Sequence, residues 1–234
     1  MKISMSWSGG KDSALALYWL LNDTRYEVAH LHCVIDEATD RIPMHEVSLE
    51  LIKAQADSAG LPLKVIRMPP GRDNHTYEAR MQAFVDECLG EGVEVLAYGD
   101  IFLEDLKQYR EKMLAGTGLQ ALFPLWKQPT GKLITEFTEA GFKTCICAVN
   151  ERYLEANCLG ETIGRDWTDS LPAGADPCGE NGEFHSFTYD GPVFRHRIPF
   201  VRGKKFSKEC ADPQTAGEFI RLHYLPLYSE KEKN

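Results

Sequence analysis

The segment SWSGGKDSALALYWLL, from Ser6 to Leu21, constrains the fold of this chain more than any other feature. A short, half-apolar stretch (MKISM) precedes it, and apolar residues occupy every face of the part that follows Ser13. This order predicts a buried strand over 1–7, a glycine-rich turn, and a helix over 12–22 packed against a sheet. The adjacent glycines permit a tight turn and a close approach of the backbone to a ligand.

The turn SGGKDS has the residue types of a phosphate-binding loop. It leads into a helix N-terminus, where unpaired N–H groups and the helix dipole favour an anion. The spacing differs from that of a Walker A loop, which places four residues between its first glycine and the GK pair. The simpler alternative is a glycine turn in which Ser or Asp caps the helix. The residues predicted to form this binding loop are Ser8, Gly9, Gly10, Lys11, Asp12 and Ser13, in which the glycine N–H groups and the serine hydroxyls would hold phosphate and Lys11 would balance its charge.

Strand and helix patterns alternate through the first half of the chain. This alternation predicts βαβ units and a parallel sheet, whose ligands bind at the carboxyl ends of the strands. The SGGKDS loop, the turn after Ile35 and Gly99-Asp100 all fall at that edge, so we expect them to converge. The predicted strands are Tyr26–Ile35, Leu63–Arg67 and Val93–Tyr98, and the predicted helices are Glu46–Ala59, His75–Leu89 and Phe102–Ala115.

Near residues 118–128 the pattern changes, which predicts one domain over 1–122 and a smaller α+β domain over 123–234. In the second part we expect a helix over 130–140, a strand over Phe142–Val149 and a hairpin. The hairpin would pair Phe184–Tyr189 with Val193–Phe200 around Asp190-Gly191-Pro192. Its second strand and the basic residues up to Lys208 would form a charged edge or dock a protein substrate.

Charge and composition exclude some classes of function. The 234 residues carry 35 acidic and 26 basic side chains, a net charge of −9, which argues against nucleic-acid binding. We see no signal peptide and no apolar run near the roughly 18 residues of a membrane span. The expectation is therefore a cytoplasmic protein without membrane contact, and a homodimer is only a general prior.

The seven cysteines are expected to be reduced thiols. Cys145 and Cys147 alternate within an apolar run as strand residues do, and no second close pair completes a zinc site. Cys178 is a candidate nucleophile, but the sequence gives no reason for a low thiol pKa.

Several polar residues at the predicted sheet edge are candidate ligand contacts. Asp100 follows directly on Gly99 at a strand end, so it can hold Mg²⁺ or nucleotide, or merely cap the next helix. Arg41 and His45, in the long turn after Ile35, can form an adenine or ribose wall, and His45 can equally be a plain surface residue.

The stretch GADPCGENGEFHSF, residues 174–187, is the most specific one downstream. Its polar side chains offer a general base and a binder of ammonium or amide groups, and Glu183 and His185 fall on one face of a strand. The alternative is a glycine-rich turn with solvated polar residues. The candidates for catalysis are Asp12, Glu180, Glu183 and His185.

SGGKDS resembles the SGGxDS loop of the PP-loop ATP pyrophosphatases, which are similar in fold to the adenine nucleotide alpha hydrolases. Together with GDIFLEDLKQYRE, PLW at 124–126 and DPCGENGEFHSF, it resembles the diphthine–ammonia ligase-like members over about residues 1 to 200. One departure is HSF at 185–187, where HTF is expected. The resemblance implies a Rossmann-like, HUP-type α/β domain for ATP and a C-terminal domain that binds the acceptor.

The resemblance further implies an AMP-forming amide ligase that uses ATP, Mg²⁺ and ammonia. The acceptor carboxylate would be diphthine on elongation factor 2, activated as an acyl adenylate with release of pyrophosphate. Asp12 and Asp100 would place the magnesium ion, and Glu180, Glu183 or His185 would bind ammonium and remove its proton. The rival functions are a PP-loop enzyme with another acceptor (tRNA thiolation or amidation, or a small molecule) and a non-catalytic adenine-nucleotide module.

Overall fold

The computed structural model describes residues 1–69, 74–211 and 219–232. Within these ranges no helix combines the length and the apolar character that crossing a membrane requires.

The first sheet contains five parallel strands in the order β5-β2-β1-β6-β7. The chain runs outward from β1 on one side, then crosses to β6 on the other side of β1. The carboxyl ends of β1 and β6 therefore flank a topological switch point, the usual ligand site of such sheets. The strands are β1 (Lys2–Ser6), β2 (Glu27–Asp36), β5 (Leu63–Met68), β6 (Val95–Ala97) and β7 (Gln120–Leu122).

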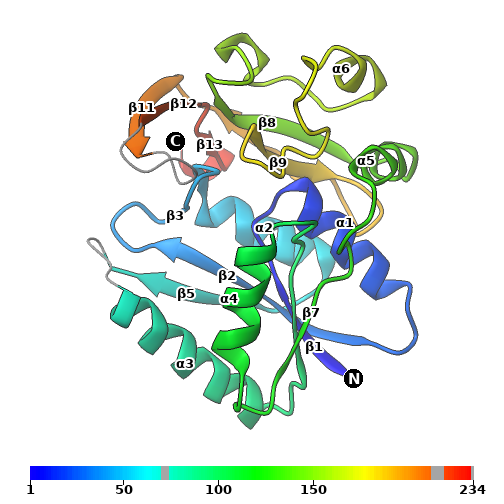
Figure 1. Cartoon of the computed structure of the whole chain (residues 1–234), viewed down its shortest axis with the longest axis vertical. Coiled ribbons are helices and arrows are strands. Elements are labelled where there is room, and N and C mark those ends of the chain that lie inside the picture. The colour runs from blue at the N-terminus through cyan, green and yellow to red at the C-terminus, as the bar shows by residue number, and fades with distance from the viewer. Residues whose placement is uncertain (70–73, 212–218, 233–234) are drawn as a thin grey trace.

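Helices cover both faces of this sheet (Figure 1). On one face, α1 and α2 share a large apolar core with the sheet, and on the other face α3 and α4 enclose a second, smaller core. The predicted alternation of strands and helices is thereby confirmed as an α/β fold. The helices are α1 (Lys11–Leu21), α2 (Leu49–Ala59), α3 (Asn74–Gly90) and α4 (Glu104–Leu114).

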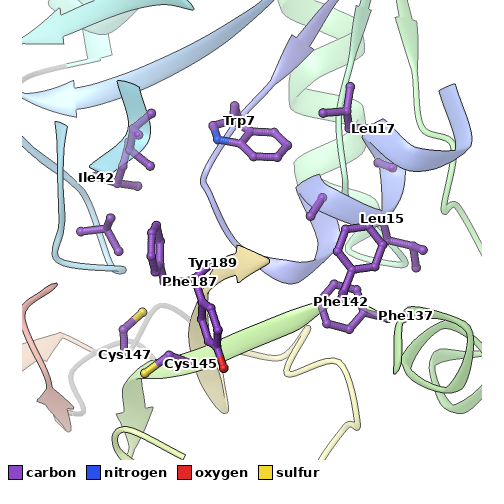
Figure 2. Close-up of a cluster of buried hydrophobic side chains, with 14 of the residues drawn as sticks. Trp7, Leu15, Leu17, Ile42, Phe137, Phe142, Cys145, Cys147, Phe187 and Tyr189 are labelled. Carbon is purple, nitrogen blue, oxygen red and sulfur yellow. The ribbon is translucent and has the colours of Figure 1, made fainter. Parts of the chain in front are cut away.

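A second, antiparallel sheet in the order β11-β12-β8-β9 lies across α1 and α2 (Figure 1). The two layers share one core, in which Phe137 stacks on Phe142 at 4.6 Å between ring centroids (Figure 2). The elements of this layer are α5 (Thr130–Glu139), β8 (Lys143–Asn150), η1 (Ala156–Cys158), α6 (Arg165–Asp169), β9 (Phe184–Asp190), β11 (Phe206–Ala211) and β12 (Phe219–Tyr224).

Short strands from the end of the chain extend the first sheet. The order β10-β13-β4-β3-β2 ties the C-terminal segment to the turn that follows β2. The two parts of the chain thus share a sheet as well as a core, and the boundary at 122/123 stays a prediction. The elements are β3 (Arg41–Ile42), β4 (Val47–Ser48), β10 (Val201–Arg202), β13 (Leu227–Tyr228) and η2 (Glu230–Glu232).

The predicted hairpin over 184–200 is wrong. Strand β9 pairs with β8, and residues 193–200 form no strand. They are held instead at the end of α2, where the N–H of Arg195 donates to the carbonyl of Ser58 at 2.8 Å and that of His196 to the Ser58 hydroxyl at 3.1 Å. Alternation of apolar residues favoured a strand, but these tertiary hydrogen bonds take the donors that strand pairing needs.

Two helix starts also differ from prediction, and β11 and β12 were not predicted. Helix α2 begins at Leu49 instead of Glu46, because the antiparallel pair β3–β4 occupies the preceding residues. Helix α4 begins at Glu104 instead of Phe102.

Replacing Ser58 by Ala should destabilise the protein by about 1–2 kcal/mol. The fully buried Ser58 hydroxyl donates to the carbonyl of His196 at 2.6 Å and accepts from its N–H, so the variant loses both bonds. Urea unfolding measures this loss. Thr24→Ala, which removes the hydroxyl of an exposed turn residue, is the control and should stay within about 0.5 kcal/mol of the unchanged protein; equal effects of the two variants would contradict the role of Ser58.

Candidate functional site

The loop Ser8–Ser13 connects β1 to α1 at the switch point of the sheet. Its backbone is compact: Gly9 adopts φ +77°, and the N–H of Gly10 donates to the Ser8 hydroxyl at 3.2 Å. The hydroxyl of Ser13 lies 3.3 Å from that of Ser8 and donates to the carbonyl of Gly10 at 3.0 Å. Gly10 is the N-cap of α1 and no side chain caps the helix, so the alternative of a Ser or Asp cap is wrong.

Gly99, at the end of β6, packs directly on the start of α1. A Cβ atom at this position would lie 3.1 Å from backbone atoms of Asp12 and Ser13, tighter than an ordinary van der Waals contact. The predicted convergence of these two segments is therefore real. Asp100 does not cap α4, whose N-cap is Leu103; it forms an ion pair with Arg110 at 2.7 Å.

The turn after β2 brings His45 to the loop but not Arg41. His45 Nδ1 lies 3.1 Å from the carbonyl oxygen of Ser186, and its ring is 4.7 Å from that of His185. Burial lowers the pKa of His45 to about 4 and lowers that of His185 as well, so both rings are neutral at pH 7. The guanidinium of Arg41 lies over the ring of Tyr228 at 4.4 Å and donates to the carbonyl of Glu46.

Lys11 points away from solvent into the junction between α1 and the 176–184 turn. Its ammonium lies 2.8 Å from Asp12 Oδ2 and 4.9 Å from the centre of the Phe184 ring, and the residue is only 4% exposed. Burial is the largest single influence on the pKa of Lys11 and lowers it, but the charge and hydrogen bond of Asp12 together with the nearby Cys178 and Glu180 outweigh it, so the pKa is raised and the side chain is cationic.

Glu180 joins the same turn to the end of β6. Its Oε1 accepts hydrogen bonds from the N–H groups of Ile101 at 2.7 Å and Phe102 at 3.3 Å. Burial, and next the charge of Asp12, raise the pKa of Glu180 to about 7. A carboxyl group with this pKa can hold or release a proton near neutral pH.

Glu183 forms hydrogen bonds within the 176–184 turn. It is fully buried, and its Oε1 accepts hydrogen bonds from the N–H of Asp176 at 2.9 Å and from Asn181 Nδ2 at 3.1 Å. These contacts shape the turn that carries Glu180. His185, two residues on, reaches His45 instead.

Three contact residues of the loop were missed by sequence reasoning. The N–H of Lys11 donates to the Ser186 hydroxyl at 3.3 Å, that of Thr188 donates to the carbonyl of Gly9 at 2.8 Å, and Gln55 also donates to that carbonyl. Gln55 carries the one usable signal, because it lies three residues after Ile52 on the apolar face of its helix, where a polar side chain is unusual. Ser186 lies in the stretch 174–187, but nothing there marks it as a loop contact, and Thr188 has no signal, since only the packing of β9 against the loop and α1 brings them there.

The carboxylates predicted to hold Mg²⁺ are each matched with a cation. Asp12 pairs with Lys11 and Asp100 pairs with Arg110. Among residues 1–69, 74–211 and 219–232, no group of three or more His, Cys, Asp or Glu side chains could hold a metal ion. As arranged, these residues do not offer Mg²⁺ a free pair of carboxylates, so placement of Mg²⁺ by Asp12 and Asp100 stays a prediction.

The cysteines nearest to the site are buried. Cys145 and Cys147 lie in β8 among apolar side chains, as the alternation predicted (Figure 2). Burial raises the pKa of the Cys178 thiol, which lies 3.5 Å from the carbonyl oxygen of Thr130. A thiol protonated at neutral pH is a poor nucleophile.

The resemblance implies AMP formation from ATP, and replacing Cys178 by Ser should leave its rate within about threefold of the unchanged protein, because a protonated thiol is a poor nucleophile. Steady-state assays at saturating ATP measure this. A loss of a hundredfold or more in a variant that still folds would reinstate Cys178 as a nucleophile.

A parallel sheet in this order, with an SGGKDS loop at the end of its first strand, defines an α/β nucleotide-binding protein of the PP-loop type. Models of the diphthamide synthase N-terminal and C-terminal domains match residues 1–121 and 129–212. The chain therefore belongs to the diphthamide synthase family, and with it to the carbon–nitrogen ligases of the ATP pyrophosphatase type.

Similar proteins include the diphthine–ammonia ligases of mouse and human, each 26% identical over 251 residues. These alignments cover 97% and 95% of this chain and 92% of each ligase. Among solved structures, the U34-tRNA thiolase NcsA from Methanococcus maripaludis aligns with a TM-score of 0.39 and 14% identity, over 59% of this chain and 57% of the thiolase. A likeness of this size contributes nothing to the assignment.

Proposed function

We propose that the chain amidates the carboxylate of diphthine on elongation factor 2, with ATP as the energy source and ammonia as the nitrogen donor. The reaction would convert ATP, carboxylate and ammonia into amide, AMP and pyrophosphate. The observation that carries the proposal is the meeting of Lys11, Glu180 and His185 at one loop, because it joins a phosphate-binding turn to acid–base groups.

In the first step the acceptor carboxylate attacks the α-phosphorus of ATP. A bond forms between the carboxylate oxygen and phosphorus, the bond to the β-phosphate oxygen breaks, and pyrophosphate leaves. N–H groups and hydroxyls of Ser8–Ser13 would bind the β- and γ-phosphates, while Lys11 would balance the charge that spreads in the transition state. The neutral rings of His45 and His185 would line this space without adding charge.

In the second step the nitrogen of ammonia attacks the acyl carbon and AMP leaves with the electrons of the carbon–oxygen bond. The nitrogen must then lose a proton. Glu180 would take it, because its carboxyl group has a pKa of about 7 and lies in the turn next to Lys11 and Asp12. Glu183 would act by holding that turn in shape.

The rival functions are less well supported. A tRNA thiolase needs a reactive thiolate, whereas burial raises the pKa values of Cys145, Cys147 and Cys178. Three of the basic residues between 195 and 208 are engaged with the protein itself: Arg202 donates to the carbonyl of Gly160, Lys205 to that of Ala156, and Lys208 to Glu46. Cytoplasmic location and a homodimer stay predictions.

The testing experiment identifies the products of ATP labelled in the α- or γ-phosphate, with ammonium and with or without diphthine-bearing elongation factor. AMP and pyrophosphate that depend on the elongation factor, and that are lost in Asp12→Ala, support the proposal. Production of ADP and phosphate would refute it. Tight ATP binding without any cleavage would favour a nucleotide-binding module instead.

A further inference from the structure

We propose that Gln55 is a positioning residue that locks the Gly9–Gly10 peptide in the orientation that binds the pyrophosphate part of ATP. The inference rests on the proposed function and deepens it, because it assigns to α2 a role in a site otherwise built by the loop and by β9. Gln55 lies on α2 and is fully buried where this helix meets the Ser8–Ser13 loop and β9.

The contacts of Gln55 admit one orientation of its side-chain amide. The indole N–H of Trp7 is only a donor, and it donates to Gln55 Oε1 at 2.8 Å. The amide nitrogen therefore faces the other way, where it donates to the carbonyl oxygens of Gly9 at 3.0 Å and Thr188 at 2.5 Å. A buried amide with all these bonds satisfied is rigid.

This arrangement fixes the plane of the peptide between Gly9 and Gly10. The carbonyl of Gly9 accepts from both Gln55 and the N–H of Thr188. In a trans peptide the C=O and N–H groups point in opposite directions. The N–H of Gly10 must then point into the loop, where it meets the Ser8 hydroxyl at 3.2 Å.

A lock of this kind is needed because the peptide joins two glycines. Without Cβ atoms on either side, the peptide plane can rotate at little steric cost, and a flipped plane would turn a carbonyl oxygen toward the phosphates. Gln55 also explains why residue 9 is glycine, since a Cβ there would lie 2.6 Å from Gln55 Oε1 and 2.7 Å from Ile52 Cδ1.

The test measures binding of ATP, inorganic pyrophosphate and AMP to Gln55→Glu by calorimetry. Glutamate keeps the size of the side chain and the acceptor for Trp7, but places an oxygen opposite two carbonyl oxygens. We expect the dissociation constants of ATP and pyrophosphate to rise about ten- to a hundredfold, the effect of one misaligned charge-assisted hydrogen bond. AMP has no β- or γ-phosphate, so its constant should change less than about threefold.

The control is Gln108→Glu on the exposed face of α4, which makes the same chemical change and should leave all three constants unaltered. If Gln55→Glu does not fold, Trp7→Phe replaces it: the lost indole N–H frees the amide to turn, so the same selective loss is expected at smaller size. If Gln55→Glu weakened the binding of AMP and of pyrophosphate equally, or weakened neither, the role of Gln55 would be overturned. If the unchanged protein binds neither ATP nor pyrophosphate, the proposed function itself fails.

Discussion

Replacing Lys11 by Met is expected to lower the rate of AMP formation about a thousandfold, the size of effect seen when one preorganised charge-stabilising group is lost. The side chain is the buried cation of the site, 2.8 Å from Asp12 and within the electrostatic reach of Glu180. Methionine fills a similar volume but leaves the negative charge of Asp12 unbalanced, next to the place where phosphate must bind. Pyrophosphate–ATP exchange measures the loss in the first step alone.

The matched control for Lys11→Met is Lys132→Met, which removes an exposed lysine of α5. It should retain full exchange activity. If Lys11→Met also retained exchange within about tenfold while remaining folded, the cation would not stabilise the transition state and its role in the proposal would be refuted.

Replacing Glu180 by Gln is expected to lower amide formation about a hundred- to a thousandfold, the usual contribution of a general base. Gln keeps an oxygen that can accept from Ile101 and Phe102, so the turn stays anchored. Because the pKa of Glu180 is raised to about 7, its carboxyl group is protonated below that pH and charged above it. At a fixed concentration of free ammonia the rate should therefore rise with pH through about 7, and this rise should disappear in the variant.

The comparison of half-reactions separates this role from a general loss of structure. Pyrophosphate–ATP exchange does not use ammonia, so Glu180→Gln should leave it nearly unchanged while amide formation falls. Glu139→Gln, on an exposed residue of α5, controls for the loss of one negative charge. Parallel loss of both half-reactions would assign Glu180 to structure instead of proton transfer.

The sequence predicted the parallel α/β sheet, the loop after its first strand and the convergence of Gly99 with that loop. These features follow from local signals: hydrophobic periodicity, adjacent glycines, and the rule that strands of a parallel sheet end at one edge. The family resemblance likewise depended on short stretches such as SGGKDS and DPCGENGEFHSF, whose order along the chain is itself sequence information.

Other features depend on the tertiary structure alone. Arg41 and His45 occupy the same turn, yet only His45 reaches the Ser8–Ser13 loop. The guanidinium of Arg41 instead stacks on the ring of Tyr228, near the other end of the chain. The segment 193–200 has the alternation of a strand, but its N–H groups bond to Ser58 instead.

Tertiary contacts also determine the protonation and the side-chain orientations of residues in the site. The pKa of Glu180 and the orientation of Gln55 arise from burial and from partners distant in the sequence. Gln55 bonds to Gly9, 46 positions before it, and Glu180 is influenced by Lys11 and Asp12 near the start of the chain. Periodicity reports which face of an element is apolar, but it carries no information about which distant group a polar side chain will meet. That pairing is fixed only when the second sheet packs across α1 and α2, and it determines charge, proton affinity and peptide orientation at the loop.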